Sequence, residues 1–166
     1  SNPATINLAT LSSTQGFRLD GAAADDGAGF VVDGVGDVNG DGRADLAVGA
    51  DGANNLGRSD GGSTYVVFGS ANPSNVDLLA LGAGGYRADG AANNDHSGTE
   101  VAGVGDVNGD GRVDLAVGAG QAGNNGRTFS GSTWVMLGFG TPSVNYARVT
   151  TTVGFPITPV TATALR

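Results

Sequence analysis

The stretch Asp37-Val-Asn39-Gly-Asp41-Gly-Arg43-Ala-Asp45 places oxygen-bearing side chains at positions 1, 3, 5 and 9 of a short segment. Glycine at position 6 permits a sharp bend, and the main-chain carbonyl of position 7 is available as a further oxygen donor. A hard divalent cation such as Ca²⁺ takes about six to eight oxygen ligands. The segment therefore predicts a calcium-binding loop.

The same pattern returns 69 positions later as Asp106-Val-Asn108-Gly-Asp110-Gly-Arg112-Val-Asp114. Aligned without a gap, residues 16–69 and 85–138 are identical at 34 of 54 positions, which indicates an internal duplication. We therefore expect two calcium sites per chain. The candidate ligands are Asp37, Asn39, Asp41, Arg43 and Asp45 in the first copy and Asp106, Asn108, Asp110, Arg112 and Asp114 in the second.

The flanking sequence decides what kind of loop this is. An EF-hand has a Glu at position 12 and lies between two amphipathic helices, but position 12 here is Val48 or Val117. The flanks are short runs of Val, Ala and Gly without helical periodicity, which is typical of strands. Each loop is therefore expected to join two strands as a hairpin.

Each repeated unit contains four candidate strands, in the first copy near residues 16–19, 30–36, 44–50 and 63–68. The second and third are nearly continuous apolar runs, which favours a sheet covered on both faces. Four strands per unit are typical of a propeller blade, and a propeller needs about four to eight blades. We predict an all-β chain of two four-stranded propeller blades, part of a propeller that other copies or missing sequence would complete.

The predicted organisation follows the repeat. We expect a connector at 1–15, the first blade at 16–69, a connector at 70–84 and the second blade at 85–138. Residues 139–166 would hold a further connector and a degenerate start of a third unit.

Composition limits the partners. Eight Arg face fifteen Asp and one Glu, and the net charge of −8 argues against nucleic acid. No apolar run approaches the length of a membrane span, so we expect no membrane insertion. Calcium loops of this kind fill readily at extracellular calcium levels, which favours an extracellular or cell-surface location.

Three stretches, Gly16–Gly21, Gly36–Ala50 and Gly62–Gly69, together resemble the FG-GAP repeats of integrin α-subunit propellers and their bacterial relatives. The resemblance implies a four-stranded blade with a calcium-binding hairpin, in a ring used for adhesion or ligand binding. Carried over by position, it makes Asp37, Asn39, Asp41 and Asp45 side-chain ligands, with Arg43 giving its carbonyl. The second copy would use Asp106, Asn108, Asp110, Asp114 and the Arg112 carbonyl.

The function expected is a non-catalytic, calcium-binding blade module for extracellular structure, adhesion or protein interaction. His96, the only histidine, has Gly27 as its counterpart, and the chain has no Gly-x-Ser-x-Gly nucleophile turn. Two alternatives stay open: a calcium-dependent carbohydrate-binding module, and an accessory region of a larger secreted enzyme. The expected partners are a protein or carbohydrate ligand and further copies of the chain, which would self-associate into a ring.

Overall fold

The computed structural model describes residues 5–139. Its regular structure consists of antiparallel strands, one short parallel pair and three single-turn 3₁₀ helices, so the all-β prediction is confirmed. No helix in this part of the chain is long and apolar enough to cross a membrane. The elements are η1 (Leu8–Thr10), β1 (Leu19–Asp20), β2 (Val31–Gly36), β3 (Asp45–Ala50), β4 (Ser63–Val67), β5 (Val76–Asp77), η2 (Leu78–Ala80), η3 (Gly82–Gly84), β6 (Gly85–Asp89), β7 (Glu100–Gly105), β8 (Asp114–Ala119) and β9 (Ser132–Met136).

The first sheet has the order β2-β3-β4-β6, with every neighbouring pair antiparallel. The predicted calcium loop joins β2 to β3 as a hairpin, as expected from its Val-rich flanks. The register shifts between Gly34 and Gly36, and Gly36 has a φ of 73°. This bulge turns the end of β2 into the loop, at a backbone angle that favours glycine.

The fourth strand of this sheet corrects our sequence-based assignment. We expected the strand near residues 16–19 to belong with the three strands that follow it. Instead β1 pairs in parallel with β5, and the fourth position is taken by β6 from the start of the second unit. The 3₁₀ turns η2 and η3 reverse the chain and bring β6 alongside β4, so this sheet crosses the predicted boundary between the units.

The second sheet has the order β7-β8-β9 and repeats the first three strands of the first sheet. Within residues 5–139 it has three strands rather than the four we predicted for a blade. The strand that would correspond to β6 falls 69 positions later. The predicted connector and third-unit start at 139–166 lie outside the described residues except for Phe139.

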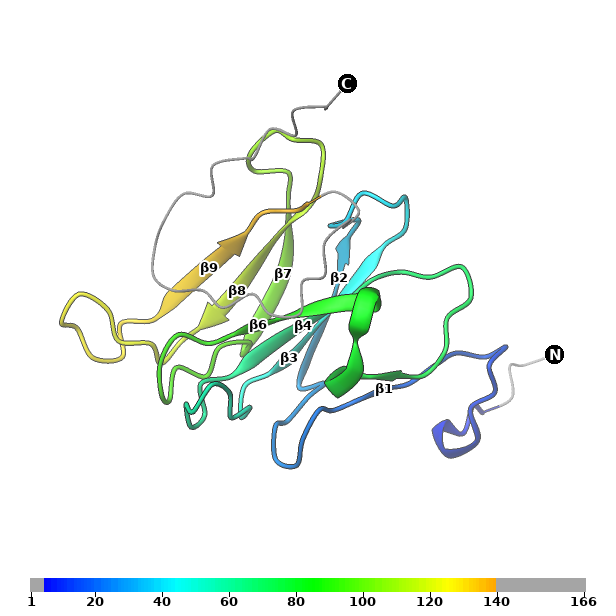
Figure 1. Cartoon of the computed structure of the whole chain (residues 1–166), viewed down its shortest axis with the longest axis horizontal. Helices are drawn as coiled ribbons and strands as arrows, with labels where there is room; N and C mark the ends of the chain where they lie inside the picture. Colours follow the sequence, from blue (N-terminus) through cyan, green and yellow to red (C-terminus); the bar gives the residue numbers. More distant parts are fainter. Residues whose placement is uncertain (1–4, 140–166) are drawn as a thin grey trace, which may run out of the picture.

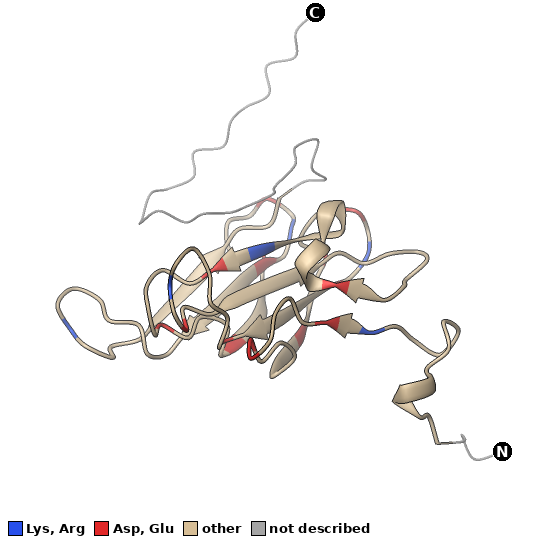
Figure 2. Ribbon diagram, turned by 60° about the horizontal axis from the view of Figure 1, so that its bottom comes forward, with Lys and Arg blue, Asp and Glu red and all other residues tan. Residues whose placement is uncertain are grey.

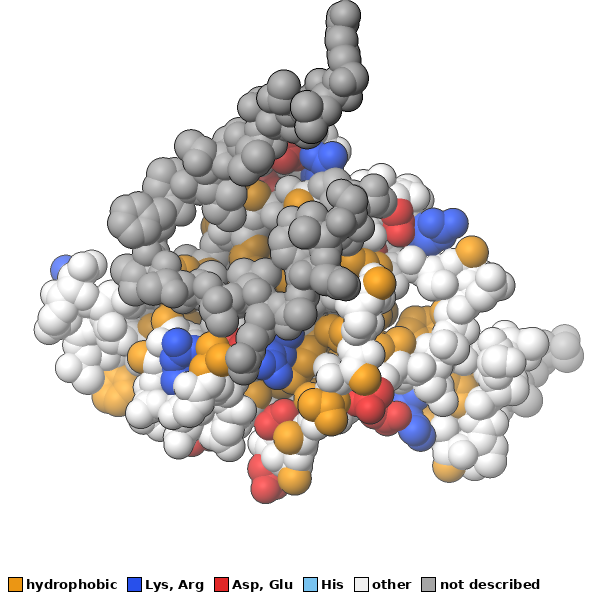
Figure 3. Space-filling model, in the orientation of Figure 1, with side chains coloured by type: hydrophobic (Ala, Val, Ile, Leu, Met, Phe, Trp, Pro, Cys, Tyr) orange, Lys and Arg blue, Asp and Glu red, His pale blue; other side chains and the backbone are white. Residues whose placement is uncertain are grey.

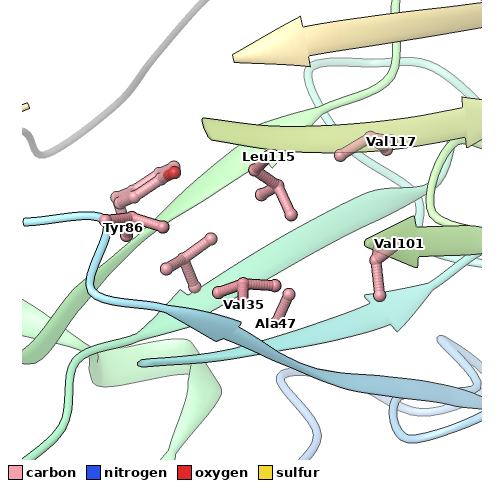
Figure 4. Close-up of a cluster of buried hydrophobic side chains, with 8 residues drawn as sticks. Val35, Ala47, Tyr86, Val101, Leu115 and Val117 are labelled. Carbon is pink, nitrogen blue, oxygen red and sulfur yellow. The ribbon is translucent and has the colours of Figure 1, made fainter. Parts of the chain in front are cut away.

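Both faces of β3 and β4 in the first sheet are covered. One buried cluster lies between the two sheets, where Val35 and Ala47 face Leu115 and Val117 (Figure 4). A second cluster lies on the opposite face, where Leu19, Val76 and Leu78 pack with Val48 and Tyr65. The first three come from the β1–β5 pair and η2, which lie beside this sheet (Figure 1). The burial of β3 on both sides matches its near-continuous apolar run. The same expectation is wrong for β2, whose Val32 is 53% exposed because no sheet stacks on that side of it within residues 5–139.

Candidate metal-binding loops

Asp37 organises the first loop. Its Oδ1 accepts hydrogen bonds from the amides of Gly40, at 2.7 Å, and Asp41, at 3.0 Å, and its Oδ2 accepts one from Gly42, at 2.8 Å. Gly40 and Gly42 have φ values of 76° and 87°, a region that side chains disfavour. The two glycines therefore let three amides converge on one carboxylate.

The middle of the loop is held by short-range bonds from side chains. Asn39 Oδ1 accepts from the Asp41 amide at 2.9 Å, and Asp41 Oδ1 accepts from the Arg43 amide at 2.9 Å. Asn39 Nδ2 also donates to Asp41 Oδ2, at 3.2 Å. The Arg43 guanidinium lies 3.9 Å from Asp41 and is half exposed, so it neutralises the loop only weakly.

Asp45 closes the loop and is fully buried. Its Oδ2 accepts from the Val38 amide at 2.9 Å, and its Oδ1 accepts from the Gly69 amide at 2.8 Å, just beyond the end of β4. Burial raises the pKa of this carboxyl, and the nearby charges of Asp41 and Asp37 raise it further. Asp45 therefore ties the loop to the sheet and contributes negative charge in a site where charge is costly.

The second loop reproduces this geometry. Asp106 accepts from Gly109, Asp110 and Gly111 at 2.7, 3.0 and 2.7 Å, and the bond from Gly111 is the largest cause of its lowered pKa. Buried Asp114 accepts from the amides of Val107 and Gly138, at 2.8 and 2.6 Å. Asn108, Asp110 and Arg112 repeat the bonds of the middle segment. All ten predicted residues therefore lie in two matched turns, five in each.

The two loops are neighbours. The Asp37 carbonyl accepts a long bond from the Val113 amide, at 3.4 Å, and the Val38 carbonyl accepts from the Phe139 amide at 2.8 Å. A side chain on Gly40 would begin 3.3 Å from Nε of Arg112. Both loops consequently lie at the same end of the paired sheets (Figure 1).

The acidic side chains do not form a complete cation cage by themselves. In residues 5–139, no group of three or more His, Asp or Glu side chains is placed so that it could hold a metal ion. The acidic residues are distributed over several turns and strand ends (Figure 2). In the loops their oxygens face main-chain amides. Oδ1 of Asp37 and of Asp106 accepts two amides each, whereas Oδ2 of these residues and both oxygens of Asp45 accept one amide and keep a second lone pair for another partner.

Sequence reasoning missed the amide donors that anchor the loops. The amides of Gly69 and Gly138 belong to the far ends of the units, yet each bonds the last aspartate of its loop. A side chain on Gly69 would begin 2.4 Å from the Ala44 carbonyl oxygen, and one on Gly138 would begin 2.5 Å from that of Val113. The recurrence of glycine at both positions was the signal that could have revealed this close approach.

Comparison with known proteins places these loops in a described repeat. The family model for the FG-GAP repeat matches residues 28–67 and 97–136. The chain is also similar to phosphatidylinositol-glycan-specific phospholipase D of Mus musculus, 38% identical over 106 residues, and of Rattus norvegicus, 37% identical over 108 residues. Each match covers 61% of this chain and 12% of the relative, so the chain spans about an eighth of the length of these curated relatives.

Proposed function

Since this chain carries two FG-GAP repeats, we propose that it is a non-catalytic, calcium-binding blade module that serves extracellular structure, adhesion or protein interaction. The observation that carries the proposal is the matched pair of loops, in which Asp37 and Asp106 each collect three main-chain amides. Two loops with the same oxygen chemistry and the same hydrogen bonds favour one shared role.

The residues of each loop fit a hard cation chemically. Asp37, Asn39, Asp41 and Asp45 offer side-chain oxygens within nine residues, and Arg43 offers its carbonyl. Burial raises the pKa of the Asp45 carboxyl, and the amides of Gly69 and Val38 act in the opposite direction. A bound divalent ion would compensate the charge of this carboxylate without a change in the strands. The second loop would use Asp106, Asn108, Asp110, Asp114 and the Arg112 carbonyl in the same way.

Calcium in these loops would act as a structural ion, because it supplies positive charge to a cluster of carboxylates. Asp45 and Asp114 fix each loop to its sheet, because they accept hydrogen bonds from the amides of Gly69 and Gly138. A site filled at 100 times its dissociation constant adds about 2.7 kcal/mol to the stability of the folded state. Two such sites would contribute about half of the stability of a modest domain.

A second candidate function is supported by the relatives. Because the match covers 12% of two phospholipases D, the chain could serve as an accessory part of a larger secreted enzyme. His96 links two loops, since its amide donates to the Asp60 carbonyl at 3.1 Å and its Nδ1 lies 3.7 Å from Asp51 Oδ2. An accessory role would keep the same calcium loops and place catalysis elsewhere.

The test is calcium binding measured directly, with Asp37→Ala and Asp106→Ala as variants of matched position. We expect the parent chain to bind two ions and each variant to bind one. A chain that binds no calcium, or whose binding survives both substitutions together, would refute the proposed sites. Hydrolysis of a glycosylated lipid by the isolated chain would refute the non-catalytic assignment.

A further inference from the structure

Equivalent valines of the two units have opposite exposure. Three valines of the first unit are at most 1% exposed because they face the second sheet, and their counterparts 69 positions later are 40–59% exposed. Since β9 repeats β4 and β7 repeats β2, the second sheet presents the same face outward. The pairs are Val35 with Val104, Val38 with Val107, and Val66 with Val135.

One equivalent pair of valines shows the reverse pattern, with the valine of the second unit buried and that of the first unit exposed. Val101 of β7 is 8% exposed because it packs against the first sheet, whereas its counterpart Val32 of β2 is 53% exposed. The contact between the sheets therefore joins two surfaces, one from each sheet. The equivalent of each surface lies on the other sheet, where residues 5–139 leave it uncovered. Hydrophobic side chains also reach the surface in several separate places on the face seen in Figure 3.

Backbone packing gives a more specific signal than exposed valines. In the first unit, a side chain on Gly49 would begin 2.0 Å from the Gly98 carbonyl oxygen, and one on Gly62 would begin 2.1 Å from that of Ser97. The amides of His96, Ser97 and Gly90 donate to the carbonyls of Asp60, Gly61 and Gly62, at 3.1, 3.0 and 2.8 Å. The segment 90–98 thus fills a glycine-lined groove along β3 and β4.

Within residues 5–139, no segment fills the corresponding groove of the second unit. Gly118 and Gly131 repeat Gly49 and Gly62, but no main-chain atom lies within 3.4 Å of a side chain built on either glycine. The groove forms a hollow of about 390 Å³, which has room for a chain segment as well as for water. Its lining is Thr99, Glu100, Gly118, Ala119, Gly120, Ser130, Gly131, Ser132 and Thr133.

The matching segment is also present, and within residues 5–139 its main-chain hydrogen bonds stay in its own unit: the Gly29 amide donates to the Gly49 carbonyl, and the Asp26 carbonyl accepts from the Gly52 amide. Residues 21–29 repeat 90–98, and glycine recurs at both ends of the segment. Gly90 and Gly98 are pressed against main-chain oxygens of the first unit, at 1.8 and 2.7 Å from a built side chain. Gly21 and Gly29 are exposed and have no such main-chain neighbour. The φ of 93° favours glycine at position 29, as the φ of 92° does at Gly98, whereas no main-chain contact within the described chain accounts for Gly21.

The strand edges of the two units show the same contrast between covered and uncovered surfaces. β6 covers the edge of β4, while the equivalent edge of β9 has no strand beside it within the described residues. Residues 16–20 repeat 85–89, and their short strand β1 pairs with β5 along one edge. The other edge of β1 has no strand partner in residues 5–139, and an edge of this kind can pair with another chain.

We propose that the chain binds a second copy of itself head to tail, and this deepens the proposed function by naming the contact through which the module self-associates. The acceptor surface is the groove with Val104, Val107 and Val135; the donor surface is residues 16–29 with Val32. The donor surface of one copy lies on the acceptor surface of the next and reproduces the contact between the chain's own two sheets. Because the surfaces differ, the association is heterologous, so it adds copies until a ring closes or an open chain grows.

The test measures mass by native mass spectrometry and light scattering in calcium, across the micromolar range. We expect assemblies larger than a dimer for the parent chain. Val135→Glu disables the acceptor surface and Val32→Glu the donor surface, and each should be monomeric. Since both valines are more than half exposed, the variants should fold. A mixture of the two should give dimers and nothing larger, because one intact surface remains on each. Leu56→Glu is the control. Leu56 lies in a loop beside the internal contact and is 37% exposed, so this variant should associate like the parent.

Three results would overturn the proposal. The first is a parent chain that stays monomeric. If Val135→Glu also destabilises that monomer, another part of the same chain covers the acceptor surface. The second is a single variant that still assembles like the parent, and the third is a mixture that does not form dimers. Calcium stoichiometry is measured on the same samples. A monomeric chain that binds two ions would support the calcium-binding function and refute the assembly. A chain that assembles without binding calcium would support the assembly and refute the calcium-binding function.

Discussion

Replacement of Asp45 by alanine tests how the loop is tied to the sheet. The carboxylate is fully buried and accepts two amide hydrogen bonds, at 2.9 Å from Val38 and 2.8 Å from Gly69. Hydrogen bonds to a charged group contribute about 1.5–3 kcal/mol each, which sums to about 3–6 kcal/mol. The substitution also removes a buried charge whose pKa is raised, so part of that loss is offset. We expect Asp45→Ala to lower the free energy of unfolding by about 2–4 kcal/mol when calcium is chelated.

Calcium should enlarge the difference, because the variant also loses a metal ligand. At 100 times the dissociation constant of the site, the additional loss is about 2.7 kcal/mol. Urea unfolding followed by Trp134 fluorescence and circular dichroism, in chelator and in calcium, separates the two contributions. Asp77→Ala is the control, since this exposed aspartate bonds one amide, that of Leu79 at 2.9 Å. An Asp45→Ala variant within about 0.5 kcal/mol of the parent in both conditions would refute the assignment.

Two further predictions concern a pair of equivalent glycines and the buried Tyr86. Gly49→Ala should abolish or severely weaken folding, because its Cβ would lie 2.0 Å from a main-chain oxygen, whereas Gly118→Ala should leave the monomer folded; thermal melting of both variants checks this, and equal losses would contradict it. Burial raises the pKa of Tyr86 above its unfolded value near 10, so the folded state holds this proton more tightly. That contribution to stability is fully present below pH of about 10 and is lost as pH rises from there, by up to about 1.4 kcal/mol per pH unit. Tyr86→Phe should therefore reduce the alkaline loss of stability while changing little at neutral pH, and an unchanged alkaline profile of the unfolding free energy would argue against it.

The loops were the most predictable part of the molecule. The spacing of Asp37, Asn39, Asp41 and Asp45 identified a hairpin whose side chains gather in one turn, and the structure places them there. Local bonding explains this success, since these side chains mostly bond amides two to seven residues away. The bond from Gly69 to Asp45 spans 24 residues and was not predicted, because sequence spacing does not show a contact that the sheet creates.

The strand partners were harder to predict. A repeat of 69 residues fixes the period of the structure, but it does not show where one sheet ends and the next begins. β1 and β6 occupy corresponding positions in the two units, yet β1 pairs with β5 and β6 pairs with β4. The difference arises because β4 precedes β6 and offers it an edge, whereas no earlier sheet precedes β1 within the described chain.

Exposure of the core residues was equally dependent on context. Val66 is fully buried and Val135 is half exposed, although both occupy the same position of the repeat. Each valine lies in a closely similar stretch, Ser-Thr-Tyr-Val-Val-Phe-Gly or Ser-Thr-Trp-Val-Met-Leu-Gly, so propensity and periodicity predict the same environment for both. Which one is buried depends on whether another sheet stacks on it, and that is a property of the assembled structure.

Calcium titration of the parent chain tests the central claim most directly. Calorimetry in buffer freed of calcium should show two bound ions per chain, and the same samples should melt at a higher temperature in calcium than in chelator. The two loops supply equivalent ligands, so loss of one through Asp37→Ala should leave one ion bound. A chain that binds no calcium and melts at the same temperature in both conditions would contradict the account, since its two repeated loops would then be ordinary turns.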